Sequence, residues 1–153
     1  MEVEFAEMYQ GQPLYTDIEI FLRQQGFTLF DLITKDGWCR RPRSCSPIFS
    51  SRRIGQLLWA DALYLRDPLS HNNNNLMTTQ SLESILKLAC ISAVLDYPDF
   101  SLELLGHLTV TFGQNPQWNF ANEILTILSQ FPELVEQDLH SLPILQKVSS
   151  YLF

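Results

Sequence analysis

The sequence contains few basic residues and no long hydrophobic run. Its 153 residues include ten Lys and Arg against 17 Asp and Glu, so the net charge is −7. Residues 69–153 hold eight acidic and only two basic residues, a net charge of −6. Nucleic-acid binding needs a basic surface that neutralises phosphates, and a membrane span needs roughly 20 consecutive apolar residues. We therefore expect neither a nucleic-acid partner nor a membrane span.

Glycine and cysteine are also scarce, with six and three residues. None of the glycines forms a G-x-G-x-x-G or related turn, which excludes the usual phosphate cradle of a nucleotide-type cofactor. Cys39, Cys45 and Cys90 are odd in number and have no histidine near the close pair, whereas zinc takes four ligands. The first ten residues lack the basic-then-apolar pattern of a signal peptide. We expect no metal site, reduced thiols and a cytoplasmic location.

The clearest pattern is a strand, a helix and a second strand within residues 3–32. Thr16 followed by Glu19 has the spacing of a capping box. Gly26 can supply the left-handed residue of a Schellman ending, with Phe27 in its hydrophobic contact. We therefore predict a helix over residues 17–25. Its apolar stripe consists of Ile18, Phe21 and Leu22.

Three segments have the character of strands. Residues 3–5 alternate apolar with acidic side chains, and residues 28–33 are apolar and β-prone. A connection this tight predicts a right-handed crossover between parallel strands. Residues 56–65, QLLWADALYL, predict a strand buried on both faces, although a short helix has the same pattern. Asp61 within it is either a catalytic carboxylate or a paired structural one.

The N-terminal segments resemble the C-terminal signature of FkbM-family methyltransferases, which depend on S-adenosylmethionine. Residues 55–65, GQLLWADALYL, resemble that family's last strand. The resemblance covers residues 1–66 apart from the loop between the strands. The other matching positions are Glu4-Phe5, Tyr9, Gly11-Gln12-Pro13-Leu14, Phe21-Leu22, Gly26-Phe27 and Leu29-Phe30-Asp31-Leu32.

The resemblance implies the C-terminal half of a class I methyltransferase sheet, which is Rossmann-like. Residues 3–5, 28–33 and 56–65 would be its fifth, sixth and seventh strands, with the seventh antiparallel and inserted between the other two. The family's cofactor-binding motifs precede this region. The chain is therefore expected to be the acceptor-side portion of an enzyme, inactive alone. The intact enzyme would transfer a methyl group from S-adenosylmethionine to a hydroxyl of a sugar or secondary metabolite. This chain alone is expected to bind no cofactor.

The long connection between residues 33 and 55 is the predicted substrate-binding segment. It contains six of the ten basic residues and leaves the carboxyl end of the 28–33 strand, where open α/β sheets bind ligands. We predict that Trp38, Arg40 and Arg41 form a lid over the acceptor pocket, with the guanidinium groups recognising phosphate or carboxylate. The alternative is a solvated loop whose arginines keep the protein soluble. The sequence indicates no catalytic or cofactor-binding residue.

The sequence changes character after residue 68, which divides it into an α/β part (1–68), a polar linker (69–79) and an all-α extension (80–153). The first predicted helix carries a wide apolar stripe and should be largely buried. Further helices should begin at Pro98, at Pro116 behind an Asn115 cap, at Pro132 and at Pro143. The stripe of the first helix comprises Leu82, Ile85, Leu86, Ala89 and Ala93, widened by Leu88, Ile91 and Leu95.

The helical extension contains no cluster of acids, histidines or nucleophiles. His107 and His140 lie far apart in the sequence and are interpreted as structural or surface residues. A second hypothesis for the whole chain is therefore a non-catalytic interaction module. Its helical tail or open sheet edge would bind a protein partner or a second copy of the chain.

Overall fold

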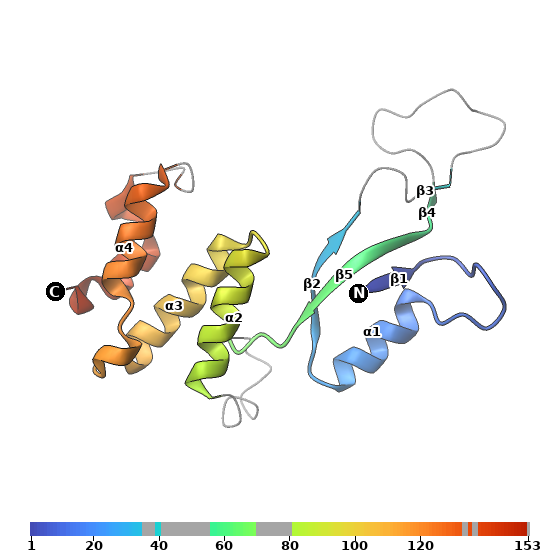
Figure 1. The fold of residues 1–153 in the computed structure, drawn as a ribbon, viewed down its shortest axis with the longest axis horizontal. Helices are drawn as coiled ribbons and strands as arrows, with labels where there is room; N and C mark the ends of the chain where they lie inside the picture. The colour runs from blue at the N-terminus through green and yellow to red at the C-terminus, as the bar shows by residue number, and fades with distance from the viewer. Residues whose placement is uncertain (35–38, 41–55, 70–80, 133–134, 136–137, 153) are drawn as a thin grey trace. The chain divides into compact units, whose positions relative to one another are not determined.

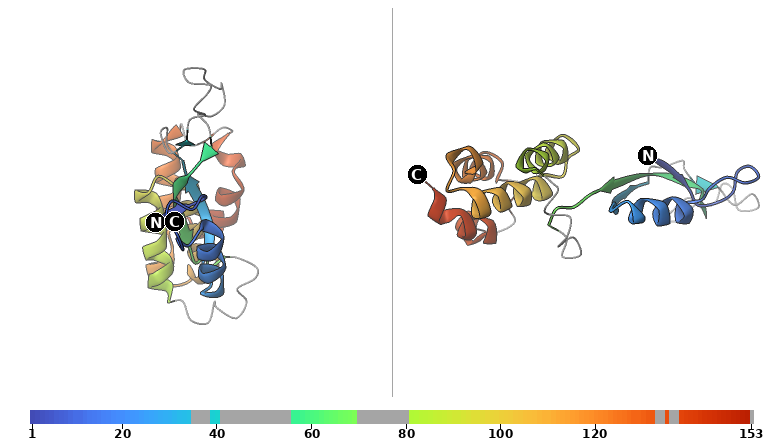
Figure 2. Two further views of the ribbon diagram at one scale, coloured as in Figure 1. Left: turned by 90° about the vertical axis from the view of Figure 1, so that its right-hand side faces the viewer. Right: turned by 90° about the horizontal axis from the view of Figure 1, so that it is seen from below.

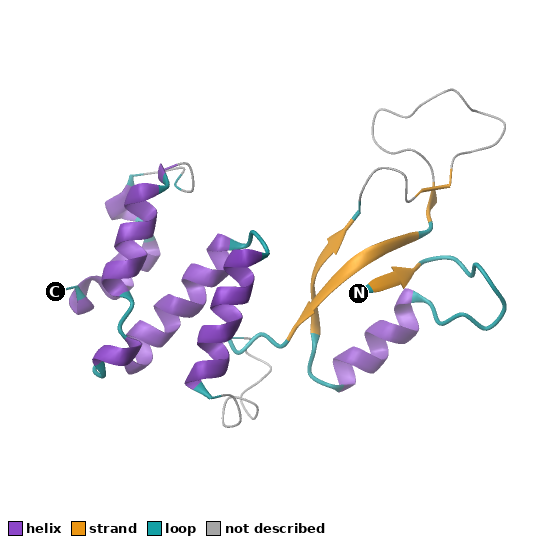
Figure 3. Cartoon of the chain, in the orientation of Figure 1, coloured by secondary structure: helices purple, strands orange, loops and turns teal. Residues whose placement is uncertain are grey.

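The computed structural model describes residues 1–34, 39–40, 56–69, 81–132, 135 and 138–152. These residues form two compact units, Met1–Asp67 and Pro68–Phe153 (Figure 1). The first unit contains a small sheet with a helix, and the second is helical (Figure 3). The protein is therefore mixed α/β.

The sheet of the first unit has the strand order β1-β5-β2. Its strands are β1 (Glu2–Glu4), β2 (Thr28–Ile33) and β5 (Trp59–Leu65). Because β5 is antiparallel to both neighbours, β1 and β2 run parallel to each other without pairing directly. This arrangement confirms the predicted insertion of an antiparallel last strand between the first two.

The predicted strand over residues 56–65 is interrupted. Gln56 and Leu57 form a separate short strand, β4 (Gln56–Leu57), which pairs with β3 (Cys39–Arg40). After Leu58 the chain continues as β5. Strand β3 in the long connection therefore forms a short antiparallel pair with β4 just after the connection, and sequence analysis missed this pair.

Helix α1 (Tyr15–Gln24) lies along one face of the sheet (Figure 2). The predicted capping box is wrong: Leu14 is the N-cap, and its amide donates to Asp17 Oδ2 at 2.9 Å. Glu19 does not return to the helix start because its carboxylate pairs with Arg23 one turn later.

The predicted Schellman ending of α1 is confirmed. Gly26 has φ +79°, in the left-handed region. The Phe27 amide donates to the Leu22 carbonyl at 3.0 Å, and the Gly26 amide donates to the Arg23 carbonyl at 3.0 Å.

Burial on the sheet is one-sided. Val3, Ala60 and Ala62 are fully buried and share one face, because Val3 lies opposite Ala60 in the register. Trp59 and Asp61, on the other face, are only half-buried, so the prediction of a strand buried on both faces is wrong. The physical reason is that α1 is the one helix among the described residues of this unit.

The second unit is a set of helices joined by short turns. Pro98 and Pro143 occupy the first turns of α3 and α5, as their positions predict. The elements are α2 (Leu82–Val94), α3 (Pro98–Phe112), η2 (Pro116–Trp118), α4 (Ala121–Gln130), η4 (Leu139–Ser141), α5 (Pro143–Val148) and η5 (Ser149–Tyr151).

The single helix predicted to begin at Pro116 is wrong. Asn115 Oδ1 does accept from the Gln117 amide at 3.1 Å, but the turn that it caps ends at Trp118. Asn119 Oδ1 then accepts from the Ala121 amide at 3.1 Å, and α4 starts there. Two asparagines four residues apart, each accepting from the amide two residues ahead, therefore divide the segment. The helix predicted at Pro132 falls mostly outside the described residues.

The core of the helical unit lies around α3, whose Leu104 and Leu108 are fully buried. Residues of α4 and α5, including Ile124 and Val148, form a core cluster with Leu102. Helix α2 buries Ile85, Ala89 and Ser92 only. The prediction that α2 is largely buried is therefore wrong in its last turns, where Ile91, Ala93, Val94 and Leu95 are exposed.

Candidate functional site

Of the three residues predicted to form a lid, only Arg40 lies among the described residues, in a short strand near the end of the sheet where the two parallel strands finish. Glu4, the last residue of β1, pairs with Trp59, and Ile33, the last residue of β2, pairs with Asp61, both near the start of β5. The β3–β4 pair immediately precedes that start, and Arg40 in β3 lies opposite Gln56. Trp38 and Arg41 lie outside the described residues.

Acidic side chains occupy the sheet face opposite to α1. Glu2 and Asp61 lie directly opposite each other, and Glu4 occupies the same face of β1. Asp61 is half-buried, and its cross-strand neighbours are Glu2 and Ile33, neither of which is a cation. Among the described strands, the register therefore places no cationic side chain opposite Asp61. The geometry therefore favours neither interpretation of Asp61, as a catalytic carboxylate or as a paired structural one.

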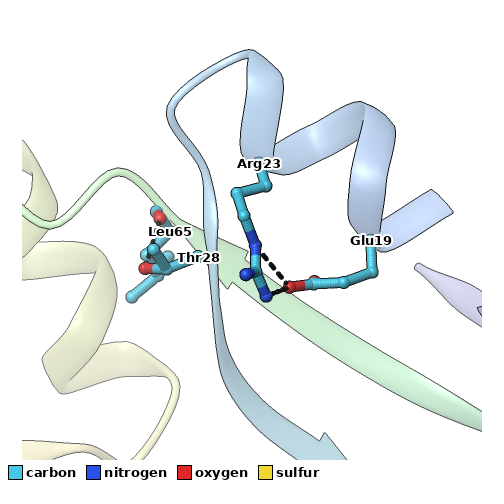
Figure 4. Close-up of polar contacts among 4 residues, drawn as sticks. All are labelled: Glu19, Arg23, Thr28 and Leu65. Atoms are coloured by element: carbon cyan, nitrogen blue, oxygen red, sulfur yellow. Dashed lines mark hydrogen bonds and ion pairs between the residues drawn. The ribbon is translucent and has the colours of Figure 1, made fainter. Parts of the chain in front are cut away.

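A polar cluster that sequence analysis missed lies between α1 and β5. Arg23 Nε donates to Glu19 Oε1 at 3.1 Å, and Arg23 Nη2 also contacts this oxygen (Figure 4). The Arg23 side chain is largely exposed, whereas Glu19 is mostly buried. An acid and a base four residues apart on one helix can pair, so this spacing could have predicted the contact.

Tyr64 of β5 belongs to the same cluster. Burial raises the pKa of its hydroxyl, and the neighbouring Tyr15 and Glu19 raise it further. Within the part of the chain that the structure describes, neither the Tyr64 hydroxyl nor Glu19 Oε2 has a hydrogen-bond partner. Tyr64 is half-buried with its hydroxyl covered, and it packs next to α1 on the sheet.

At the other end of the sheet, side chains make contacts at and next to Phe27. The Arg66 guanidinium lies 4.4 Å from the centre of the Phe27 ring, a cation–π distance. Thr28 Oγ1 donates to the Leu65 carbonyl at 3.3 Å (Figure 4). These contacts join the turn after α1 to the end of β5.

The helical unit offers no assembled reactive group among its described residues. His107 on α3 lies edge-on to Phe112, with ring centres 6.5 Å apart, and partial burial lowers its pKa. Cys90 is a free, exposed thiol. In the ranges that the structure covers, no three His, Cys, Asp or Glu side chains converge as metal ligands. Searching the same residues finds no helix that is long and apolar enough to cross a membrane.

A scan against protein-family models and searches of curated proteins and solved structures find no match to this chain. A functional assignment therefore rests on the geometry of each unit and on the sequence resemblance.

Proposed function

We propose that the first unit is the acceptor-side portion of an S-adenosylmethionine-dependent methyltransferase. In the intact enzyme, the methyl group would pass to a hydroxyl of a sugar or secondary metabolite. The single observation that carries the proposal is the strand order β1-β5-β2, with an antiparallel strand between two parallel ones. This is the order that the FkbM-family resemblance implies for the last three strands of a class I sheet.

The position of Arg40 supports the acceptor role. It lies beside the end of the sheet where β1 and β2 finish, which is the ligand-binding end of open α/β sheets. The proposal assigns acceptor recognition to Trp38, Arg40 and Arg41. It assigns S-adenosylmethionine binding to a part of the enzyme outside this sequence, which contains no glycine-rich turn.

The test is a kinetic comparison in the intact enzyme. Replacing both Arg40 and Arg41 with alanine removes charged hydrogen-bond donors worth about 1.5–3 kcal/mol each, so the acceptor KM should rise roughly tenfold or more. The KM for S-adenosylmethionine should not change. Arg66→Ala, at the other end of the sheet, is the matched control. An unchanged acceptor KM in the double variant would reject the acceptor role.

A second candidate function concerns the helical unit, which we propose acts as an interaction module. The observation in its favour is the group of apolar side chains exposed at the end of α2. Both proposals can hold in one protein, because they concern different units.

A further inference from the structure

The solvent face of α2 changes from polar to apolar along its length. Glu83, Ser84 and Lys87 occupy its first half and are exposed, as expected for a surface helix. In the second half the same face presents Cys90, Ile91 and Val94, followed by Leu95 at the C-cap. We call these four residues the apolar end of α2.

The exposure of this surface follows from helical geometry. Ile85, Ala89 and Ser92 face α3 and the core, and residues 91 and 94 lie on the opposite side of the helix at 100° per residue. Ile91 is 52% exposed, Val94 86% and Leu95 45%. Neighbours spaced by three and four residues form a contiguous patch, which marks an interaction surface more often than scattered single residues do.

The charges around the apolar end determine which partner it can accept. Asp96 and Asp99 directly follow it and are exposed, and Glu103 lies one turn further along α3. Lys87 precedes it as one of only two basic residues in positions 69–153. A second copy of the chain carries the same net charge of −6 over residues 69–153, and an anionic lipid surface is also negative, so both would be repelled by this unit.

We propose that the apolar end of α2 binds a basic amphipathic segment of another protein. Apolar side chains of that segment cover Ile91 and Val94, and its Lys or Arg residues pair with Asp96 and Asp99. The inference rests on the interaction role proposed for the helical unit and adds the surface and the charge of the partner.

The test uses the full chain and two synthetic peptides of about 18 residues. One peptide has leucines on one helical face and lysines on the other, and its control has glutamates in place of the lysines. Binding is followed by the anisotropy of the labelled peptides. An environment-sensitive fluorophore on Cys90, in a chain with Cys39→Ser and Cys45→Ser, reports where the peptide binds.

The proposal predicts saturable binding of the lysine peptide, a blue shift at Cys90, and weaker binding at high salt. Ile91→Ser with Val94→Ser should lower its affinity about tenfold or more, whereas Val110→Ser on α3 should not. Equal binding of both peptides would reject the basic partner but leave the interaction role standing. Unchanged affinity in the double serine variant would reject the surface itself. Concentration-dependent dimerisation lost in that variant would show that a second copy is the partner.

Discussion

Thr109 joins two helices of the second unit through a buried hydroxyl, and its replacement gives a sharp prediction. The residue is fully buried in α3. Its Oγ1 donates to the Leu105 carbonyl at 2.9 Å and accepts from the Phe120 amide at 2.9 Å. Valine has nearly the same shape, so Thr109→Val keeps the packing but leaves the Phe120 amide without its acceptor.

The expected cost follows from the two lost hydrogen bonds. An amide left unsatisfied in a partly buried position costs about 1–3 kcal/mol, so Thr109→Val should lower the free energy of unfolding by about 2 kcal/mol. Thr109→Ser keeps the hydroxyl and removes one methyl group, which should cost about 1 kcal/mol. The valine variant should therefore be the less stable of the two.

Urea unfolding followed by Trp118 fluorescence provides the assay. Trp118 is buried in the helical unit, and replacing Trp38 and Trp59 with phenylalanine leaves it as the sole tryptophan. The slope of the free energy with urea should not change, so the midpoints report stability directly. If Thr109→Val were as stable as Thr109→Ser or more so, the hydroxyl would not be the link between α3 and the start of α4.

Three further predictions concern other positions. Gly113→Ala should lower the free energy of unfolding by about 2 kcal/mol or more in the same assay. The added Cβ would overlap the Thr109 carbonyl oxygen and lie 3.0 Å from Tyr151 Cδ1. A variant as stable as the original protein would contradict this. Gly26→Ala should cost about 1 kcal/mol, measured by unfolding of the first unit, because φ is +79°. Burial lowers the pKa of His107 in the folded protein below its ordinary value of 6.5. Below about pH 7 the unfolded chain therefore binds more protons at this position than the folded protein does. The free energy of unfolding should fall as the pH falls through 6.5. His107→Gln should reduce that loss in urea titrations at several pH values, and an unchanged pH profile would contradict it.

For α1, the local signals predicted the end of the helix better than its beginning. Gly26 ended α1 where expected, because few other residues adopt its left-handed conformation. The start of α1 was misplaced because Asp17 and Glu19 are both acids near the helix start, and only the structure shows that Glu19 pairs with Arg23.

Burial was predicted less well, because it depends on which elements pack together. The hydrophobic pattern of β5 predicts burial on two faces, but α1 covers one. The stripe of α2 includes residues that packing against α3 leaves exposed, such as Ile91. Periodicity identifies an apolar face but not the neighbour that covers it.

The candidate site was only partly predictable. The order of the three strands followed from the resemblance, whereas the β3–β4 pair left no clear pattern in a loop rich in arginine and serine. The cluster of Tyr64 with Glu19 joins residues 45 positions apart, a proximity that depends on how α1 packs on the sheet.

The most direct test of the central claim is to read the coding sequence upstream of Met1. A methyltransferase half should encode, in frame and within roughly 150 residues, an apolar strand followed by a glycine-rich turn, with an acidic residue at the end of the next strand. The proposed function predicts this segment. An in-frame stop codon immediately upstream, with no separate chain carrying such a turn, would contradict it.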